Sequence, residues 1–221
     1  MTLFDHAGID LSAGPDWRAE ERMMAELGGL VCGVDEVGRG PLAGPVVAAA
    51  VILDPVRVPV GLNDSKKLTE KARVRLAAEI REVALAVSIA EASVEEIDTI
   101  NILEAAMLAM RRAVAGLAVR PLGALVDGNR DPLIGITTET LVKGDARSLS
   151  IAAASIVAKV FRDELMKNLA EKHPEYGWDR NAGYGVPVHL EALKLVGVTP
   201  FHRKSFAPIR DILHQQNTLT D

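Results

Sequence analysis

The chain has 221 residues, of which 48% are hydrophobic and 25% charged, and its formal net charge is −5 at pH 7. This composition is typical of a globular protein with one sizeable core. The single cysteine, Cys32, excludes an intrachain disulfide and is expected to pack in an apolar strand, and the negative charge neither supports nor excludes nucleic-acid binding.

The start of the chain carries acidic residues, Asp5 and Asp10, where a secretory signal would have a basic region. The longest uncharged stretch, residues 40–53, contains two prolines and is too short to cross a bilayer as a helix. We therefore expect a cytoplasmic protein without a membrane span.

Hydrophobic spacing and turn residues predict strands first, then strands that alternate with helices. This order favours an α/β layer structure built on a mixed sheet. A short helix with Asp16 as its N-cap is expected first, and Thr69 is expected to cap a later one. The predicted helices cover residues 15–27, 69–82, 94–117, 148–171 and 188–196, and the predicted strands cover residues 30–35, 46–53, 83–92, 123–126 and 137–142, with a polar end that frays.

Asp35 and Glu36 end the first predicted strand, just before Gly38-Arg39-Gly40. Burying both acids unpaired would cost several kcal/mol, so they are expected to face water or a divalent cation. Consecutive residues on a regular strand point to opposite faces, which would prevent the two side chains from sharing an ion. The sequence therefore predicts that the strand breaks after Asp35, with the glycines supplying the freedom to do so.

Two further acids fit the same site. Asp127 ends the fourth predicted strand and meets Asp35 if the two strands are neighbours, while Asp163 shares a helical face with Ser155 and Lys159. Four carboxylates would hold two ions, and oxygen-only ligation favours Mg²⁺ or Mn²⁺ over zinc. The alternatives are an ordinary turn acid at Asp127 and a solvated or Lys159-paired acid at Asp163.

Seven motifs resemble the ribonuclease HII family, the type 2 ribonucleases H, and occur in that family's order. They are Gly33-Val34-Asp35-Glu36-Val37-Gly38-Arg39-Gly40-Pro41-Leu42-Ala43-Gly44-Pro45-Val46, Asp64-Ser65-Lys66-Lys67-Leu68, Val126-Asp127-Gly128-Asn129, Lys143-Gly144-Asp145, Ala154-Ser155-Ile156-Val157-Ala158-Lys159-Val160-Phe161-Arg162-Asp163, Gly183-Tyr184-Gly185 and His202-Arg203-Lys204-Ser205-Phe206.

The resemblance implies an RNase H-like α/β fold, with a mixed five-stranded sheet flanked by helices and a helical C-terminal portion. It implies an N-terminal helical extension over residues 1–28, a catalytic domain over 29–185 and a C-terminal helical segment and tail over 186–221. The implied enzyme is a monomeric, metal-dependent ribonuclease H. It hydrolyses RNA in RNA:DNA hybrids and nicks duplex DNA 5′ of a single embedded ribonucleotide, leaving a 3′-hydroxyl and a 5′-phosphate, which begins ribonucleotide removal.

Specific residues take their roles from the same resemblance. Asp35, Glu36, Asp127 and Asp163 are the implied catalytic acids, which hold two Mg²⁺ or Mn²⁺ ions. The resemblance also implies that Gly38, Arg39 and Gly40 read the ribose 2′-hydroxyl and that Tyr184 packs on the deoxyribose that follows. From the residue types themselves, Lys66 and Ser155 are the first candidates for phosphate contacts, ahead of Lys143, Lys159 and Arg203, and the alternative for each is a surface charge or a cap.

Two positions depart from the family's pattern. Val186 stands where the family commonly has Thr, and Ala182 where it commonly has a basic residue. Both departures concern the backbone contacts beside Tyr184 and leave the acids untouched.

Two other functions remain open. One is a metal-dependent phosphodiesterase on the same fold that cuts DNA without needing a ribose hydroxyl. The other is a hybrid-binding protein that has lost its activity. The intact acids argue against the second alternative, because a binder has no need to keep mutually repelling carboxylates.

Overall fold

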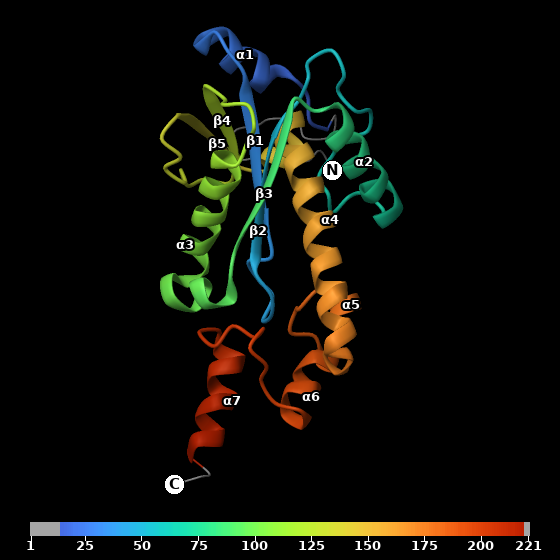
Figure 1. Cartoon of the computed structure of the whole chain (residues 1–221), viewed down its shortest axis with the longest axis vertical. Helices are drawn as coiled ribbons and strands as arrows, with labels where there is room; N and C mark the ends of the chain where they lie inside the picture. Colours follow the sequence, from blue (N-terminus) through green and yellow to red (C-terminus); the bar gives the residue numbers. More distant parts are fainter. Residues whose placement is uncertain (1–13, 219–221) are drawn as a thin grey trace, which may run out of the picture.

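Five strands form one mixed sheet in the order β3-β2-β1-β4-β5 in the computed structural model, which describes residues 14–218 (Figure 1). β1 pairs antiparallel with β2 and parallel with β4, β2 pairs antiparallel with β3, and β4 pairs parallel with β5. The predicted mixed five-stranded sheet is confirmed. The strands are β1 Val31–Val37, β2 Val46–Ile52, β3 Ala86–Ala92, β4 Gly123–Asp127 and β5 Thr137–Leu141.

Helices cover both faces of this sheet, with α3 (Val94–Ala115) on one side and α2 (Glu70–Val83) and α4 (Leu149–Lys172) on the other (Figure 1). Residues of one parity on the central strands, such as Val34 and Ala48, pack against α3, while those of the other parity, such as Val47 and Ala49, pack against α2 and α4. This alternation follows from the two-residue period of a strand.

Polar caps fix where the helices begin. Thr69 accepts a hydrogen bond from the N–H of Ala72 at 3.2 Å, so this predicted cap is confirmed. Ser148 likewise accepts one from the N–H of Ile151 at 3.1 Å and caps the start of α4. Asp16 is not the cap of α1 (Arg18–Leu27), which follows Trp17; Asp16 instead accepts from the N–H of Arg18.

The helix predicted over residues 94–117 is interrupted. Asn101 has φ 69° and ψ 164°, and its side-chain oxygen accepts from the N–H groups of Leu103 and Glu104. Asn101 therefore caps the second segment of α3, because its side chain satisfies the amides exposed there.

The C-terminal portion lies at one end of the sheet (Figure 1) and contains α5 (Trp178–Asn181), α6 (Pro187–Leu195) and α7 (Ala207–Thr218). Two 3₁₀ turns precede it in the chain, at Gly144–Ala146 and Pro174–Tyr176. Its core joins these helices to the end of α4. The sequence predicted a fraying end where α7 forms. Residues 1–13, with Asp5 and Asp10, and residues 219–221 lie outside the described part. Among the described helices, none combines the length and apolar character needed to span a membrane.

Candidate active site

The parallel pairing of β1 and β4 brings two of the predicted acids together. Val34 lies beside Val126 in this pairing, so the next residues along, Asp35 and Asp127, lie level with each other and on the same face of the sheet. Asp127 is the last residue of β4. The prediction that the first and fourth strands are neighbours is confirmed.

Glu36 reaches the site differently from the prediction. β1 does not break after Asp35: it continues to Val37, with Glu36 paired to Ala48 of β2, so the two acids point to opposite faces. The antiparallel partner β2 keeps the strand regular. β4 ends level with Asp35, so β1 has no strand neighbour on that side at Glu36. The Glu36 side chain can therefore reach Asp35 and Asp127 around the end of β4.

A third strand end supplies an acid that the sequence analysis did not assign. β5 ends at Leu141 beside Asp127, and the chain then turns through Lys143, whose φ is 56°. This turn lets the N–H of Gly144 donate to Asp127 Oδ1 at 2.6 Å and brings the buried Asp145 to the cluster. The strand-end argument that selected Asp127 would have selected Asp145 as well.

The pKa values show that these acids act on one another. Burial raises the pKa of Asp35 well above its usual range, and the carboxylates of Glu36, Asp127 and Asp145 raise it further, against a hydrogen bond from Ser155. Burial likewise raises the pKa of Asp145 to about 6, with Asp127 adding to the shift. Asp35, Glu36, Asp127 and Asp145 form what we call the acid cluster.

The structure does not bring Asp163 to the acid cluster. Asp163 follows Ser155 by eight residues on α4, which is about 12 Å along a helix that rises 1.5 Å per residue. Its carboxylate accepts from Lys159 Nζ at 2.7 Å, beside Glu70 of α2. The alternative that Asp163 pairs with Lys159 is the arrangement observed.

Lys66 and Ser155 both lie at the acid cluster. Partial burial lowers the pKa of Lys66, but the surrounding carboxylates, Asp145 and Asp35 among them, raise it overall. Ser155 is buried, hydrogen-bonds to Asp35 and lies 2.9 Å from Ser65 Oγ. Lys66 therefore offers a positive charge near the acids, whereas Ser155 orients Asp35.

The donor set of the acid cluster suits a hard divalent cation. It consists of carboxylate oxygens alone, with Lys66 and Arg39 as the nearby cations, and a metal ion would remove the repulsion that raises the pKa values. Within residues 14–218, no three Asp, Glu, His or Cys side chains already converge on one point, and Glu36 Oε1 lies 3.4 Å from Arg39 Nη1. Binding a metal therefore requires side chains to turn.

The predicted ribose-reading residues also come together. A Cβ atom on Gly40 would lie 3.2 Å from the ring of Tyr184, which is half exposed, so the aromatic ring rests on a bare glycine. Gly38 has φ 95°, and a Cβ there would lie 2.2 Å from Arg162 Nε. Only glycine fits at position 38, because a side chain would clash with Arg162 and because residues other than glycine rarely adopt this positive φ.

Two buried arginines hold the segment that contains these glycines. Arg162 donates to the carbonyls of Ala43, Pro45 and Ala182 at 2.9–3.1 Å. Arg203 is fully buried and donates to the carbonyls of Gly38, Arg39 and Gly44. The prediction of Arg203 as a phosphate contact is wrong, because its five donors face the protein interior.

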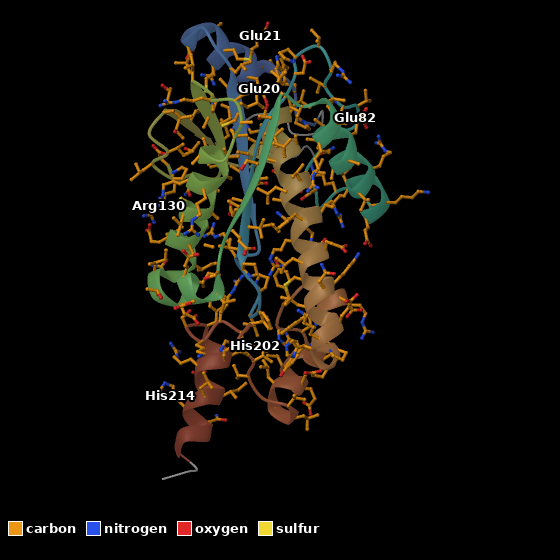
Figure 2. The ribbon with its side chains drawn as sticks, viewed as in Figure 1. Glu20, Glu21, Glu82, Arg130, His202 and His214 are labelled. Atoms are coloured by element: carbon orange, nitrogen blue, oxygen red, sulfur yellow. The ribbon has the colours of Figure 1, made fainter. Side chains whose placement is uncertain are left out.

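The carbonyl of Tyr184 is held by His189, which is backed by His202, where the C-terminal portion meets the sheet (Figure 2). His189 Nδ1 must donate to that carbonyl, at 2.9 Å, so its Nε2 accepts, 3.0 Å from His202 Nε2. His202 Nδ1 in turn accepts from the N–H of Thr199. Burial lowers the pKa of His202 to about 4, and the neighbouring His189 adds to the shift. Both rings are therefore neutral near pH 7.

Together, the sheet order, the strand-end carboxylates and the glycine-lined segment define a metal-dependent phosphodiester hydrolase on an RNase H-like fold. The family model for ribonuclease HII matches residues 32–209. The chain belongs to the ribonuclease HII family, and it is a ribonuclease H: a divalent-metal-dependent endonuclease that acts on RNA:DNA hybrids.

Individual relatives agree with this assignment. The chain is 59% identical over 207 residues to ribonuclease HII of Cereibacter sphaeroides strain KD131, covering 93% of this chain and 97% of the relative. It is 62% identical over 181 residues to the enzyme of Dechloromonas aromatica, covering 82% and 92%. The crystal structure of ribonuclease H2 from Pyrococcus horikoshii superimposes with a TM-score of 0.73 at 28% identity, covering 85% of this chain and 99% of that one.

Proposed function

We propose that this enzyme nicks duplex DNA on the 5′ side of a single embedded ribonucleotide as well as cutting uniform hybrids, leaving a 3′-hydroxyl and a 5′-phosphate. We further propose that it acts as a monomer with two Mg²⁺ or Mn²⁺ ions. The observation that carries the proposal is the acid cluster, which gathers four carboxylates at one end of three neighbouring strands; Gly40, which contacts Tyr184, follows Glu36 by four residues in the chain.

In this proposal the metal ligands are Asp35, Glu36, Asp127 and Asp145. Asp145 takes the place that the family resemblance gave to Asp163, because the pKa of Asp35 responds to Asp145, whereas Asp163 is engaged by Lys159 about 12 Å along α4 from the Ser155 level. When bound, divalent cations supply an activated water and neutralise charge on the scissile phosphate.

The chain's own residues contribute positioning and charge. Ser155 orients the carboxylate of Asp35, and the N–H of Gly144 fixes that of Asp127. Lys66 places a cation near the cluster, where a backbone phosphate would accept it. The bare backbone at residues 38–40 suits contact with a 2′-hydroxyl, the group that separates RNA from DNA, and the ring of Tyr184 offers a flat apolar surface for a sugar.

The test is a nicking assay on two duplexes of one sequence, one all-DNA and one with a single ribonucleotide, in Mg²⁺ and in Mn²⁺. We expect a single nick 5′ of the ribonucleotide and none in the all-DNA control. Equal cutting of both duplexes would favour the alternative of a DNA-cutting phosphodiesterase. If the enzyme cuts uniform hybrids but neither duplex, it is still a ribonuclease H, and the proposed activity on single ribonucleotides is wrong.

The role of Tyr184 has its own measurement. Tyr184→Ala should lose more activity on the duplex with a single ribonucleotide than on a uniform hybrid, because only the former places a deoxyribose next to the ribonucleotide. An equal loss on both substrates would contradict the assigned role.

A further inference from the structure

Arg203 fixes the direction of two successive peptide units in the segment Gly38-Arg39-Gly40. Its guanidinium lies in the protein interior and donates through Nη2 to the carbonyl of Gly38 at 2.6 Å and through Nη1 to the carbonyl of Arg39 at 3.0 Å. Nε donates to the carbonyl of Gly44 at 2.9 Å. Three planar donors therefore hold three backbone oxygens on one side of the segment.

This direction decides where the amides of the segment point. In a trans peptide unit the C=O and the following N–H point in opposite directions, and no described peptide bond is cis. Because the Gly38 and Arg39 carbonyls face Arg203, the N–H groups of Arg39 and Gly40 face away from it. Within residues 14–218, neither N–H donates a hydrogen bond to another group of the protein.

The surroundings of these two amides are those of a ligand site. The acid pair Asp35-Glu36 precedes the segment in β1, and the half-exposed ring of Tyr184 rests on Gly40. Two adjacent N–H groups directed away from Arg203 offer a pair of donors to an oxygen acceptor.

We infer that Arg203 is a positioning residue for ribose recognition, which turns the amides of Arg39 and Gly40 toward the 2′-oxygen of the nucleotide at the scissile position. The inference rests on the proposed function, since it needs a substrate whose ribose is read. Arg203 does not touch the nucleic acid; it acts through the backbone of residues 38–40.

Arg162 provides a matched control. It is also buried without a carboxylate partner and also donates to three carbonyls, but these belong to Ala43, Pro45 and Ala182. Replacing either arginine with lysine keeps the charge and removes the planar set of donors. Arg162 also packs against Gly38, but only Arg203 donates to the Gly38 and Arg39 carbonyls, so only its variant removes hydrogen bonds from the peptide units that present the two amides.

The experiment compares the full-length wild type, Arg203→Lys and Arg162→Lys. It measures kcat and KM on the duplex with one ribonucleotide, the Kd for the all-DNA duplex, and the melting temperature. We expect Arg203→Lys to lose about tenfold or more in kcat/KM at unchanged all-DNA affinity, a loss equal to about one or two hydrogen bonds. Arg162→Lys should lose about threefold at most in kcat/KM, although its melting temperature should fall about as much as that of Arg203→Lys. Equal kinetic losses in both variants would overturn the inference and leave Arg203 with a purely structural role.

A measurement on the wild type keeps the inference testable if Arg203→Lys does not fold. In the metal-free wild-type protein, the ¹⁵N–¹H resonances of Arg39 and Gly40 should shift on adding the ribonucleotide-containing duplex and not on adding the all-DNA duplex. Equal shifts with both duplexes would overturn the inference. If the wild type instead cuts all-DNA as well as ribonucleotide-containing duplex, the proposed function itself fails, and this outcome is separate from either result above.

Discussion

The acid cluster and the arginine pair, Arg162 with Arg203, both gather like charges away from bulk water, but they resolve the repulsion in opposite ways. Each guanidinium donates to three backbone carbonyls. In the acid cluster, burial raises the pKa values of the carboxylates, and their mutual repulsion adds to the shift. A charge satisfied by the backbone is a fixed part of the scaffold, whereas an unsatisfied one marks a place for an exchangeable ion.

The two regions are also connected. The arginine pair holds residues 38–45, which follow directly on the strand that carries Asp35 and Glu36. Residues 42–44 hydrogen-bond in turn to the segment around His202, through Gly44 N–H to the Phe201 carbonyl and Arg203 N–H to the Leu42 carbonyl. The C-terminal portion is therefore joined by backbone contacts to the segment that follows the acid pair of β1.

The largest expected effect separates the acids by position. Asp127→Asn and Asp145→Asn should each lower turnover by at least about 100-fold, because each removes a charged oxygen ligand from the site. Asp163→Asn, with its carboxylate on Lys159, should stay within about threefold of the wild type. Hybrid cleavage at saturating Mg²⁺ measures all three. A severe loss in Asp163→Asn together with a mild one in Asp145→Asn would reverse the assignment.

The arginine pair should behave as scaffold. Arg203→Met leaves three buried carbonyls without donors, which should cost about 3 kcal/mol of unfolding free energy and lower the melting temperature by roughly 6–12 °C. Thermal unfolding by circular dichroism measures this change. An unchanged melting temperature would mean that the buried guanidinium contributes nothing net.

Histidine protonation extends the same comparison, because a charged His202 would be buried beside another histidine, His189, with no carboxylate partner in the described part of the chain. The pKa of His202 is about 4 in the folded protein against 6.5 unfolded, so between these values only the unfolded chain takes up the proton. Stability should therefore fall as the pH drops from 6.5 to 4, by about 3 kcal/mol in total from this group. His202→Asn should flatten the difference in urea unfolding between pH 7 and pH 4.5. Parallel pH curves for the two proteins would contradict the shift.

Removing a charge from the acid cluster should stabilise the fold, whereas removing the charge of Arg203 should destabilise it. At pH 8 and without metal, Asp145→Asn should be about 1 kcal/mol more stable than the wild type, because the cost of burying the Asp145 charge and its repulsion from Asp127 both disappear. The gap should close below about pH 6, where the folded wild type protonates this carboxyl. Mg²⁺ should raise the melting temperature of the wild type more than that of the variant. A destabilised metal-free variant would show that the carboxylate is structurally satisfied.

The smallest expected effect concerns the departure at Val186. This residue is the N-cap of α6 and makes no side-chain cap hydrogen bond. Val186→Thr, which restores the residue common in the family, should add about 0.5–1 kcal/mol through a capping hydroxyl and leave kcat unchanged. Urea unfolding and hybrid cleavage measure the two effects. A change in kcat without a gain in stability would show that this position acts on Tyr184 instead.

The sequence by itself determined most local features: the five strands, the main helices, the cap Thr69 and the position of Asp127 at the end of its strand. These features follow from hydrophobic periodicity and from short-range hydrogen bonding, which neighbouring residues decide. The family motifs could also be recognised from the sequence alone, because each is a short run of consecutive residues.

Only the tertiary structure decided which charged groups meet. Asp145 and Asp163 are both acids in family motifs, and choosing between them requires the strand order β1-β4-β5 and the position of α4 along β1. The continuation of β1 through Glu36 depended on pairing with β2, and the burial of Arg203 depended on carbonyls about 160 residues earlier in the chain. Such contacts are set by long-range packing, and no pattern local to either residue encodes them.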